Sequence, residues 1–501
     1  MTRGGEDPAP AGEALPSESG ERRTGPGLLA RGSFWSASGY AGTQLIRFGG
    51  NLILWRLLFE EAFGVMALVS VFLTGLQMFS DVGIGPSLIQ NDREDADFVN
   101  TAWTMQVLRG VAIWAVACAG AYPLAAFYGE PSLAYLVPVV GIAAVLNGFN
   151  SSNIFAEQRR IEIRRVALLD LGAQLGATVA MIGWALVHPS VWALAVGGLV
   201  GAGVKMIASH RLLPGRRNRF CWDRSALRSL VTFGRWIFLS TVLTFLALQS
   251  DRLIFGKLVP MAMLGVYSIA QIYATLPPQL SSHVVSHVVF PALSRHRQQG
   301  HDLAAAYRRV RVPMLIGSAF LVSCLLAGGP TMIRFLYDER AVDAGWIVQL
   351  LSVGAWFLVL ESVNGALLLA DGRSRAVAAA QGAKVLAMAA LIPVGYGLGG
   401  FPGAIAGFAA ADVFKYLASA WAVRAMGAPV WGQDAAFTIA LAASAALGLL
   451  ARAGSQRVEL PLILEGLSIL AVLTIFWGGA LVAHRRSPRP IVQALGRHPL
   501  A

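Results

Sequence analysis

Fourteen segments of 18 or more residues with few charges recur along the chain, and each is long enough to cross a lipid bilayer as a helix. Apolar residue types make up 55% of the 501 residues and charged types only 14%, against about 25% in a soluble domain. The pattern therefore predicts an all-α polytopic membrane protein with about 14 transmembrane helices. The expected spans cover residues 31–55, 62–85, 98–122, 132–156, 166–187, 190–210, 230–256, 264–290, 309–329, 344–370, 374–397, 402–424, 434–453 and 460–483.

Lysine and arginine are distributed unevenly between the two sides of the predicted membrane. With both termini in the cytoplasm, the cytoplasmic segments hold 28 of the 40 Lys and Arg residues and the outer loops hold 6. This asymmetry follows the positive-inside rule and predicts a multi-pass protein whose two termini are cytoplasmic. The formal net charge of +12 is therefore mainly topological, with some attraction to anionic lipid headgroups, and does not indicate a nucleic-acid partner.

The N-terminal residues and the three cysteines carry no sign of export or cross-linking. Residues 1–27 are rich in Gly, Pro, Ser and Glu and contain no apolar stretch, so we expect a disordered tail rather than a signal peptide. Cys118, Cys221 and Cys324 are far apart and unpatterned. We therefore expect neither a disulfide nor a metal site from them.

Two stretches of the chain resemble each other at an offset of 201 residues. Residues 51–68 (NLILWRLLFEEAFGVMAL) align with residues 252–269 (RLIFGKLVPMAMLGVYSI), and the polar positions align as well as the apolar ones. Six predicted helices separate the copies, so both run in the same direction, as in transporters with parallel repeats. Chance similarity between apolar segments is the alternative. The matches pair Leu52-Ile53 with Leu253-Ile254, Arg56 with Lys257, Gly64-Val65 with Gly265-Val266, Trp35 with Trp236, Thr43 with Thr244, and GPSLIQ (85–90) with FPALSR (290–295).

The repeat divides the chain into two six-helix lobes that enclose a central cavity, with an added helix pair after the second lobe. The predicted units are a disordered cytoplasmic tail at 1–27, an N-lobe at 28–212 (helices 1–6), a basic cytoplasmic linker at 213–228, a C-lobe at 229–425 (helices 7–12), helices 13–14 at 429–484, and a cytoplasmic tail at 485–501.

Several of the apolar helices carry one polar face. A helix that faces only lipid is apolar all round, so polar residues at steps of three or four predict a face that lines a cavity. Arg47 lies about 24 Å into its helix, which is too deep for its side chain to reach the interface easily. The predicted cavity-lining, substrate-binding residues are Tyr40, Gln44, Arg47, Asn51, Gln77, Asp81, Gln271, Gln279, Glu361, Asn364 and Lys384.

The apolar stretch QSDRLIFGKLV carries Asp251 and Arg252 side by side, and a later helix carries Asp412 and Lys415. Both sets are candidates for ion pairs or for ion coupling, and a purely structural ion pair is the alternative for the first. His283 is four residues from His287, a spacing that a metal could use. No third ligand is evident nearby, so cavity lining is the preferred interpretation and no metal site is predicted.

The sequence lacks the motifs of several enzyme classes. It contains no GxxxxGK[ST] phosphate loop and no GxSxG, HExxH or CxxC framework. The longest outer loop, residues 328–345, is too small for a catalytic domain. These observations predict a transporter or facilitator rather than an enzyme, and no cofactor.

The strings at 59–90 and 250–295 resemble the two characteristic stretches of oligosaccharide flippases. In the second string the pattern is D-x3-G-K, then LG-x-Y, then FP-x-LS-R. These flippases form the polysaccharide-transporter branch of the multidrug/oligosaccharidyl-lipid/polysaccharide superfamily, and the resemblance covers residues 31–425. It implies a two-lobed bundle, alternating access, a bacterial inner-membrane location, and transfer of an undecaprenyl-pyrophosphate-linked oligosaccharide from the inner to the outer leaflet. It implies no universal catalytic residue.

The polar residues fit such a cargo. A pyrophosphate favours Arg or Lys, and Arg47 and Lys384 are the candidates, one in each lobe. The expected partners are the lipid-linked oligosaccharide and membrane lipids, with a polysaccharide polymerase and a chain-length regulator as further candidates. The alternatives are a cation-coupled multidrug or small-molecule exporter, a flippase for the lipid-linked peptidoglycan precursor, and a membrane glycan polymerase, which the short outer loops disfavour.

Overall fold

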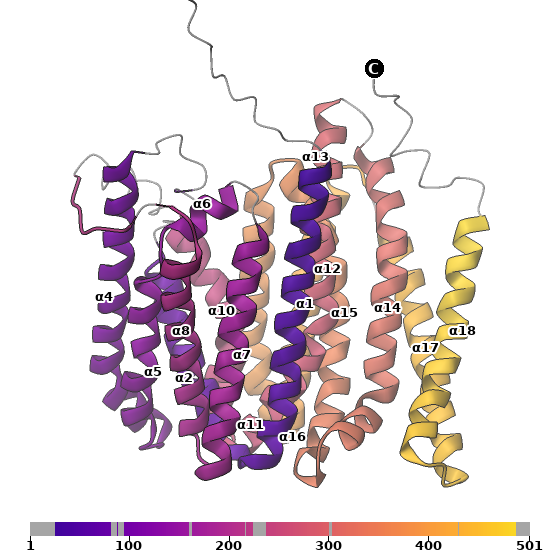
Figure 1. Cartoon of the computed structure of the whole chain (residues 1–501). Helices are drawn as coiled ribbons and strands as arrows, with labels where there is room; N and C mark the ends of the chain where they lie inside the picture. Colours follow the sequence, from indigo (N-terminus) through magenta and orange to yellow (C-terminus); the bar gives the residue numbers. More distant parts are fainter. Residues whose placement is uncertain are drawn as a thin grey trace, which may run out of the picture.

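The computed structural model describes residues 26–81, 88, 95–159, 163–215, 217–223, 237–299, 303–428 and 430–486, and among these the only regular secondary structure is helical. Figure 1 shows an upright bundle in which α1 begins and α18 ends at the same face. We call this the terminal face and the opposite one the distal face. The predicted tails before residue 26 and after residue 486, the match at Trp236, and most of 85–90 lie outside the described residues.

The N-terminal half contains the helices of the first six predicted spans. Helix α5 continues into the short helix α6 across a bend of 59°, and together they cover the fourth span. The bounds are α1 Pro26–Leu57, α2 Glu60–Phe79, α4 Ala96–Tyr128, α5 Leu133–Gly148, α6 Asn153–Arg159, α7 Ile163–Val187 and α8 Trp192–Leu212.

The C-terminal half contains the helices of the remaining eight spans. The bounds are α10 Ile237–Leu258, α11 Met261–Ala274, α12 Leu276–Val284, the π-helical turn η1 Val285–Val289, α13 Phe290–Gln298, α14 Leu303–Leu336, the 3-10 turn η2 Glu339–Ala341, α15 Val342–Ala370, α16 Ser374–Arg424, α17 Trp431–Arg457 and α18 Leu462–Arg486. Helices α17 and α18 pack against α14 at one edge of the bundle.

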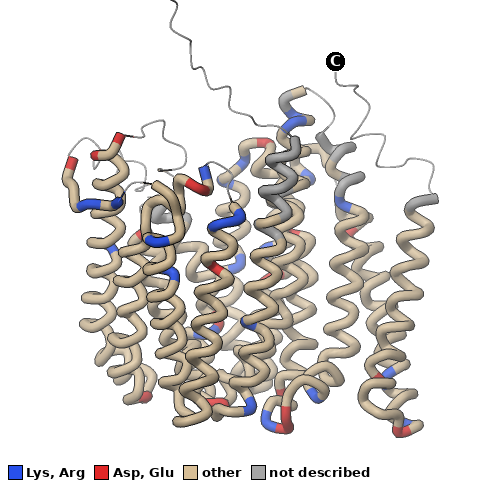
Figure 2. Tube along the Cα trace, in the orientation of Figure 1, with Lys and Arg blue, Asp and Glu red and all other residues tan. Residues whose placement is uncertain are grey.

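Helical segments lie within all fourteen predicted spans, so the sequence correctly predicts an all-helical polytopic fold. By length and apolarity, nine helices among the described residues can cross a membrane, and the bent pair α5–α6 makes ten. One of the nine is α16, which contains two spans in its 51 residues. Figure 2 shows most charged residues near the two faces and few between them, as expected for a membrane protein.

Backbone chemistry explains where the long helices break. Pro277 and Pro278 occupy the first turn of α12, where their missing N–H groups leave no hydrogen bond unmade, and the preceding helix ends at Ala274. The two arms of α16 meet at Gly399 and Gly400 at the distal face. Gly400 has φ 60°, ψ −144°, a conformation essentially restricted to glycine, so this residue allows the chain to reverse.

The two lobes meet at matched positions of the sequence repeat. Helices α2 and α11 pack against each other, and Gly64 of α2 lies directly against Gly265 of α11. A Cβ atom on Gly64 would overlap the carbonyl oxygen of Met261, and one on Gly265 would overlap that of Glu60. The repeat therefore places one glycine from each lobe at the point where the two backbones come closest.

We expect the Gly64→Ala variant to be less stable than the wild-type protein by about 1–3 kcal/mol, because the new methyl group collides with backbone that cannot move aside alone. Gly183→Ala in α7 is the matched control, since a Cβ there meets no atom within 4 Å. Thermal unfolding of both detergent-solubilised variants measures the difference. Equal melting temperatures would contradict this close contact between the lobes.

The described part of the linker lies against the N-terminal lobe. Its backbone amides at Cys221 and Asp223 donate to the hydroxyls of Thr104 and Thr101 on α4, at 3.1 and 3.0 Å. The side-chain amide of Asn218 donates to the Ser152 hydroxyl at 2.6 Å. These contacts attach residues 217–223 to the first lobe.

Candidate functional site

A cavity of about 790 Å³ lies within the N-terminal lobe, between α1, α2, α5, α7 and α8. The sequence also predicts a cavity between the two lobes, and that expectation stays a prediction. Helices α1 and α8 both pack on α7 and leave space beside it. The polar lining residues are Tyr40, Thr43, Arg47, Asn51, Ser70, Asn147, Gln158, Asp170, Gln174, Thr178 and Lys205.

Small residues hold α1 against α7 and set the register between them. A Cβ atom on Gly39 would lie 2.6 Å from the Cβ of Ala167, and one on Gly50 would lie 2.7 Å from the γ-carbon of Thr178. Glycine therefore lets the two helix backbones approach closely, as at many helix pairs in membranes. Because both helices start at the terminal face and run in the same direction, α1 residues lie level with α7 residues about 128 positions later.

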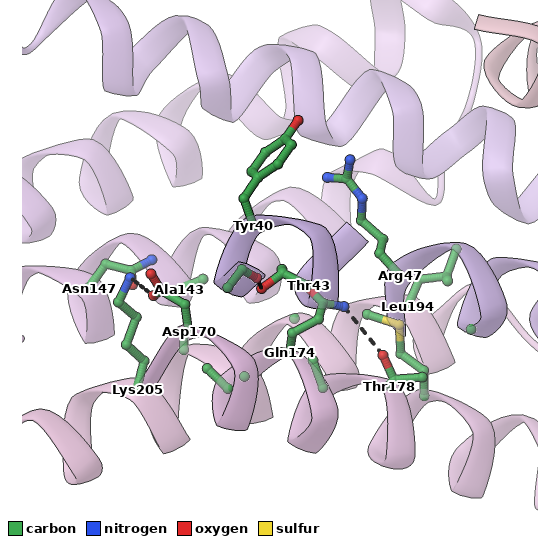
Figure 3. Close-up of a pocket in the computed structure, with 18 of the residues that line it drawn as sticks. Tyr40, Thr43, Arg47, Ala143, Asn147, Asp170, Gln174, Thr178, Leu194 and Lys205 are labelled. Atoms are coloured by element: carbon green, nitrogen blue, oxygen red, sulfur yellow. Dashed lines mark hydrogen bonds and ion pairs between the residues drawn. The ribbon is translucent and has the colours of Figure 1, made fainter. Parts of the chain in front are cut away.

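Arg47 of α1 is one of the residues that line the cavity, and its side chain extends from α1 on the same side as Tyr40 (Figure 3). Its side chain is exposed, and among the described residues it has neither an acidic partner nor a hydrogen bond. Tyr40 accepts a hydrogen bond from Gln44 at 2.8 Å and stacks on His283 of α12, with 5.9 Å between ring centres. The deep arginine predicted from the sequence is thus a cation available to a ligand.

A second charged group lies nearer the terminal end of the cavity. Lys205 of α8 and Asp170 of α7 form an ion pair with 2.6 Å between Nζ and Oδ1, and their side chains are 31% and 42% exposed. Gln174, one turn further along α7, donates to Thr178 at 3.3 Å. Figure 3 shows Asn147, Asp170 and Lys205 at one end of the view and Arg47, Thr178 and Leu194 at the other.

The distal end of the cavity is apolar. Its lining there comes from the last turns of α1 and α7 and the first turns of α2 and α8, and all four side chains are buried or half-buried. These residues are Leu54, Met66, Met181 and Leu194. The cavity therefore has polar groups toward the terminal face and an apolar floor toward the distal face.

Lys384, the second predicted phosphate ligand, lies in the C-terminal half and away from this cavity. Its ammonium group contacts Asp412 on the other arm of α16 at 2.7 Å and lies 5.1 Å from the centre of the Phe408 ring. Lys384 and Asp412 are only 3% and 2% exposed. The positive charge of Lys384 is therefore already paired within the protein.

The other charged residues predicted in the C-lobe are also paired internally. Lys415 contacts Glu361 at 2.8 Å. Asn364 accepts from the Tyr307 hydroxyl and donates to Ser419 at 3.2 Å. In this structure, these residues connect α14, α15 and α16 rather than line the N-terminal cavity.

Asp251 is fully buried and accepts hydrogen bonds from the Tyr267 hydroxyl and the Gln271 amide, both at 2.6 Å. Arg252 donates to Gln249 at 3.2 Å, and no Asp251–Arg252 ion pair occurs among the described residues. The adjacent acid and base in the sequence thus face different neighbours, because successive helical positions are 100° apart.

Three further predicted residues, Gln77, Asp81 and Gln279, do not line the N-terminal cavity. Asp81 pairs with Arg109 at 3.6 Å, and the Gln77 carbonyl accepts from the same arginine at 2.6 Å. Gln279 of α12 is exposed. His283 contacts Tyr40, as described, and the side chain of His287 lies outside the described residues. Of the eleven predicted cavity residues, Tyr40, Arg47 and Asn51 line the N-terminal cavity.

Two sets of residues were missed from the sequence. Asp170, Gln174 and Thr178 follow the four-residue spacing of a polar helix face, which was the available signal in α7.

Arg311 pairs with Asp434 of α17 at 2.6 Å, and both are buried. That pair joins the added helices to the C-terminal half, and nothing in the local sequence predicts that two residues so far apart come into contact.

The lobes are also joined at the distal face by what we call the distal clasp: Trp55, Glu60, Asp338 and Arg340. Arg340 donates to the Trp55 and Leu58 carbonyls at 2.8 and 3.0 Å, which satisfies groups that a helix end leaves without partners. Asp338 accepts from the Trp55 indole at 3.1 Å and pairs with Arg340 at 2.7 Å. Glu60 lies 3.6 Å from Arg340.

The distal clasp has an expected pH dependence. Burial alone would raise the pKa of Asp338, but hydrogen bonds from Arg340 and Trp55 outweigh it and hold the pKa below its usual value. The pKa of this carboxyl is lower in the folded protein than in the unfolded chain, where it is about 4, so the ionised carboxylate stabilises the fold above about pH 4. This stabilisation is lost as the pH falls through the lower pKa of the folded protein. The pair is partly exposed, so we expect Asp338→Asn to cost at most about 1 kcal/mol at pH 7. Melting curves should differ at pH 7 and converge once the pH falls below the lowered pKa of Asp338; a difference that persists in stronger acid would contradict the assignment.

A family profile described as "Polysaccharide biosynthesis protein" matches residues 53–337. Among curated relatives, the succinoglycan biosynthesis transport protein ExoT of Rhizobium meliloti (strain 1021) is 25% identical over 303 residues, which are 60% of this chain and 59% of that protein. The lipopolysaccharide biosynthesis protein WzxC of Escherichia coli (strain K12) is 22% identical over 332 residues, 64% of this chain and 65% of that protein. The matches thus span about three fifths of the length of these relatives.

Solved structures share the fold at low sequence identity. The lipid II flippase MurJ, in an inward closed conformation, superposes with a TM-score of 0.70 at 13% identity, over 90% of this chain and 100% of that one. An inward-facing MATE-family multidrug resistance transporter has a TM-score of 0.59 at 14% identity, over 79% and 95%. The chain therefore shares the fold of these two proteins. The family profile, which covers more than half of the sequence, shows that this chain belongs to the polysaccharide biosynthesis protein family.

Proposed function

We propose that this protein is a flippase that moves an undecaprenyl-pyrophosphate-linked oligosaccharide from the inner to the outer leaflet of the bacterial inner membrane. The product would supply exopolysaccharide, capsule or O-antigen synthesis. Transport proceeds by alternating access, with the terminal face toward the cytoplasm. The observation that carries the proposal is Arg47, which has no acidic partner among the described residues and lines a cavity of about 790 Å³ in a multi-pass membrane protein of the polysaccharide biosynthesis family.

The charge of the cavity supports an anionic headgroup. Lys205 and Asp170 cancel each other, so Arg47 leaves the lining with a net positive charge. A guanidinium group offers a planar fork of donors that matches phosphate oxygens. Amide and hydroxyl groups of Asn147, Gln174 and Thr43 can bond sugar hydroxyls beside it.

The alternative of a cation-coupled exporter receives less support. A site for organic cations favours unpaired carboxylates, yet Asp412 and Glu361 each contact a lysine at less than 3 Å. Arg47, by contrast, lines the cavity and has no acidic partner among the described residues. The alternative of a peptidoglycan-precursor flippase differs from our proposal only in the glycan and is therefore tested by substrate choice.

Translocation by the purified full-length chain in proteoliposomes tests the proposal. The probes are a fluorescent undecaprenyl-pyrophosphate-linked oligosaccharide, a fluorescent peptidoglycan precursor on the same lipid, and ethidium as an organic cation. We expect protein-dependent transfer of the first probe between leaflets, measured as loss of protection from a membrane-impermeant quencher. Transfer of only the precursor or only ethidium would establish the corresponding alternative instead.

A further inference from the structure

We infer that Asp170 and Lys205 form a sugar-binding subsite of the N-terminal cavity, with a phosphate subsite at Arg47 and an apolar floor beyond it. In this arrangement the glycolipid lies with its sugars toward the terminal face and its lipid toward the distal face. The inference rests on the proposed function and deepens it by assigning the direction in which the ligand binds. It also identifies two residues that select for the sugar part of that ligand.

The helix register gives the separation of the two subsites along the cavity. Gly42 packs against Leu171 and Gly50 against Thr178, so Asp170 lies level with about residue 42 of α1. Arg47 is five positions further along α1, which corresponds to about 7.5 Å at 1.5 Å per residue. The spacing allows a phosphate group at Arg47 and an adjacent sugar ring at Asp170 and Lys205.

The net charge differs between the two subsites in the way that a phosphate group and a sugar ring require. Arg47 is a cation without a partner, so an anionic phosphate gains the full attraction. Lys205 and Asp170 neutralise each other and are both partly exposed, so together they offer donors and acceptors without net charge. Neighbouring hydroxyls of a sugar ring can donate to the two oxygens of one carboxylate and accept from the ammonium group.

The polarity of the whole cavity follows the same order. From the terminal face it runs from the Asp170–Lys205 pair, through Arg47, to the apolar side chains of Leu54 and Met66 (Figure 3 shows the first two steps). A lipid-linked glycan has the same sequence of sugar, phosphate and hydrocarbon. A lipid in the leaflet on the terminal side already has its headgroup toward that face, so it can bind without turning over.

The experiment uses the full-length protein in lipid nanodiscs and two probes, undecaprenyl pyrophosphate and undecaprenyl-pyrophosphate-linked disaccharide. For the wild-type protein we expect the disaccharide to strengthen binding by about tenfold, the range of one or two charge-assisted hydrogen bonds. For Asp170→Asn we expect this ratio of dissociation constants to fall to near one. Asp371→Asn is the matched control, because Asp371 pairs with Arg373 at 2.8 Å outside the cavity and should keep the wild-type ratio.

Two further variants separate recognition from folding. Asp170→Glu keeps the carboxylate and should recover part of the ratio, whereas the neutral double variant Asp170→Asn/Lys205→Gln should show the same loss as Asp170→Asn. A wild-type ratio of one, or an unchanged ratio in both Asp170→Asn and the double variant, overturns the sugar subsite. Failure of either probe to bind the wild-type protein at all would instead overturn the proposed function.

Discussion

The Arg47→Gln variant is expected to lose glycolipid binding by about 10- to 100-fold, because it removes the cavity's unpaired cation. A hydrogen bond to a charged group contributes about 1.5–3 kcal/mol, which corresponds to that range of affinity. Glutamine keeps a polar side chain of moderate length, so the cavity should remain open and hydrated. Binding of undecaprenyl pyrophosphate to the variant in nanodiscs measures the effect, and surface polysaccharide of cells carrying the variant reports its consequence.

Arg47→Lys and Arg373→Gln are the matched controls for this prediction. The lysine variant keeps the charge but loses the planar fork of donors, so its affinity should fall between those of wild type and Arg47→Gln. Arg373 belongs to a surface ion pair with Asp371, and its replacement should leave binding unchanged. Wild-type affinity in Arg47→Gln would exclude this arginine from ligand binding.

Replacing Lys384 by Met is expected to destabilise the fold by about 3–5 kcal/mol, because it leaves the buried carboxylate of Asp412 without its counter-ion. The double variant Lys384→Met/Asp412→Leu removes both charges and should recover most of that loss, since a well-packed apolar pair often replaces a buried ion pair without cost. Chemical unfolding of the wild type, both single variants and the double variant gives the coupling energy between the two side chains.

A comparison of Arg47→Gln with Lys384→Met also separates the roles proposed for these two basic residues. We expect Arg47→Gln to change binding and leave stability near that of the wild type, and Lys384→Met to change stability first. If Lys384→Met is as stable as the wild type and binds undecaprenyl pyrophosphate more weakly, Lys384 belongs to the substrate site, as the sequence suggested.

The two halves of the protein use similar ion pairs in different environments. Asp170 and Lys205 join α7 to α8, and Lys384 and Asp412 join the two arms of α16, with acid and base exchanged between the halves. The first pair is partly exposed and lines the cavity, whereas the second is almost fully buried. The two pairs thus differ in access, since the first lies in the cavity lining and the second is enclosed by protein.

Much of this organisation was predictable from the sequence. Long apolar segments predicted every span, because an uncharged stretch in a bilayer must satisfy its backbone hydrogen bonds as a helix. The offset of 201 residues placed Gly64 and Gly265 at equivalent positions, and they lie against each other in the structure. The division into units between residues 28 and 484 stays a prediction. Tyr40, Arg47 and Asn51 of the polar stripe of α1 lie in the lining of the N-terminal cavity, and their role as substrate ligands stays a prediction.

What the sequence determined by itself is therefore where the chain is helical and, in α1, which face is polar, since both follow from spacing along a single segment. Only the tertiary structure decided which polar faces meet. It paired Lys384 with Asp412 and left Arg47 unpaired, although both are deep bases in apolar helices. The physical reason is that the free charge of a side chain depends on its neighbours from other helices, and periodicity within one helix carries no information about them.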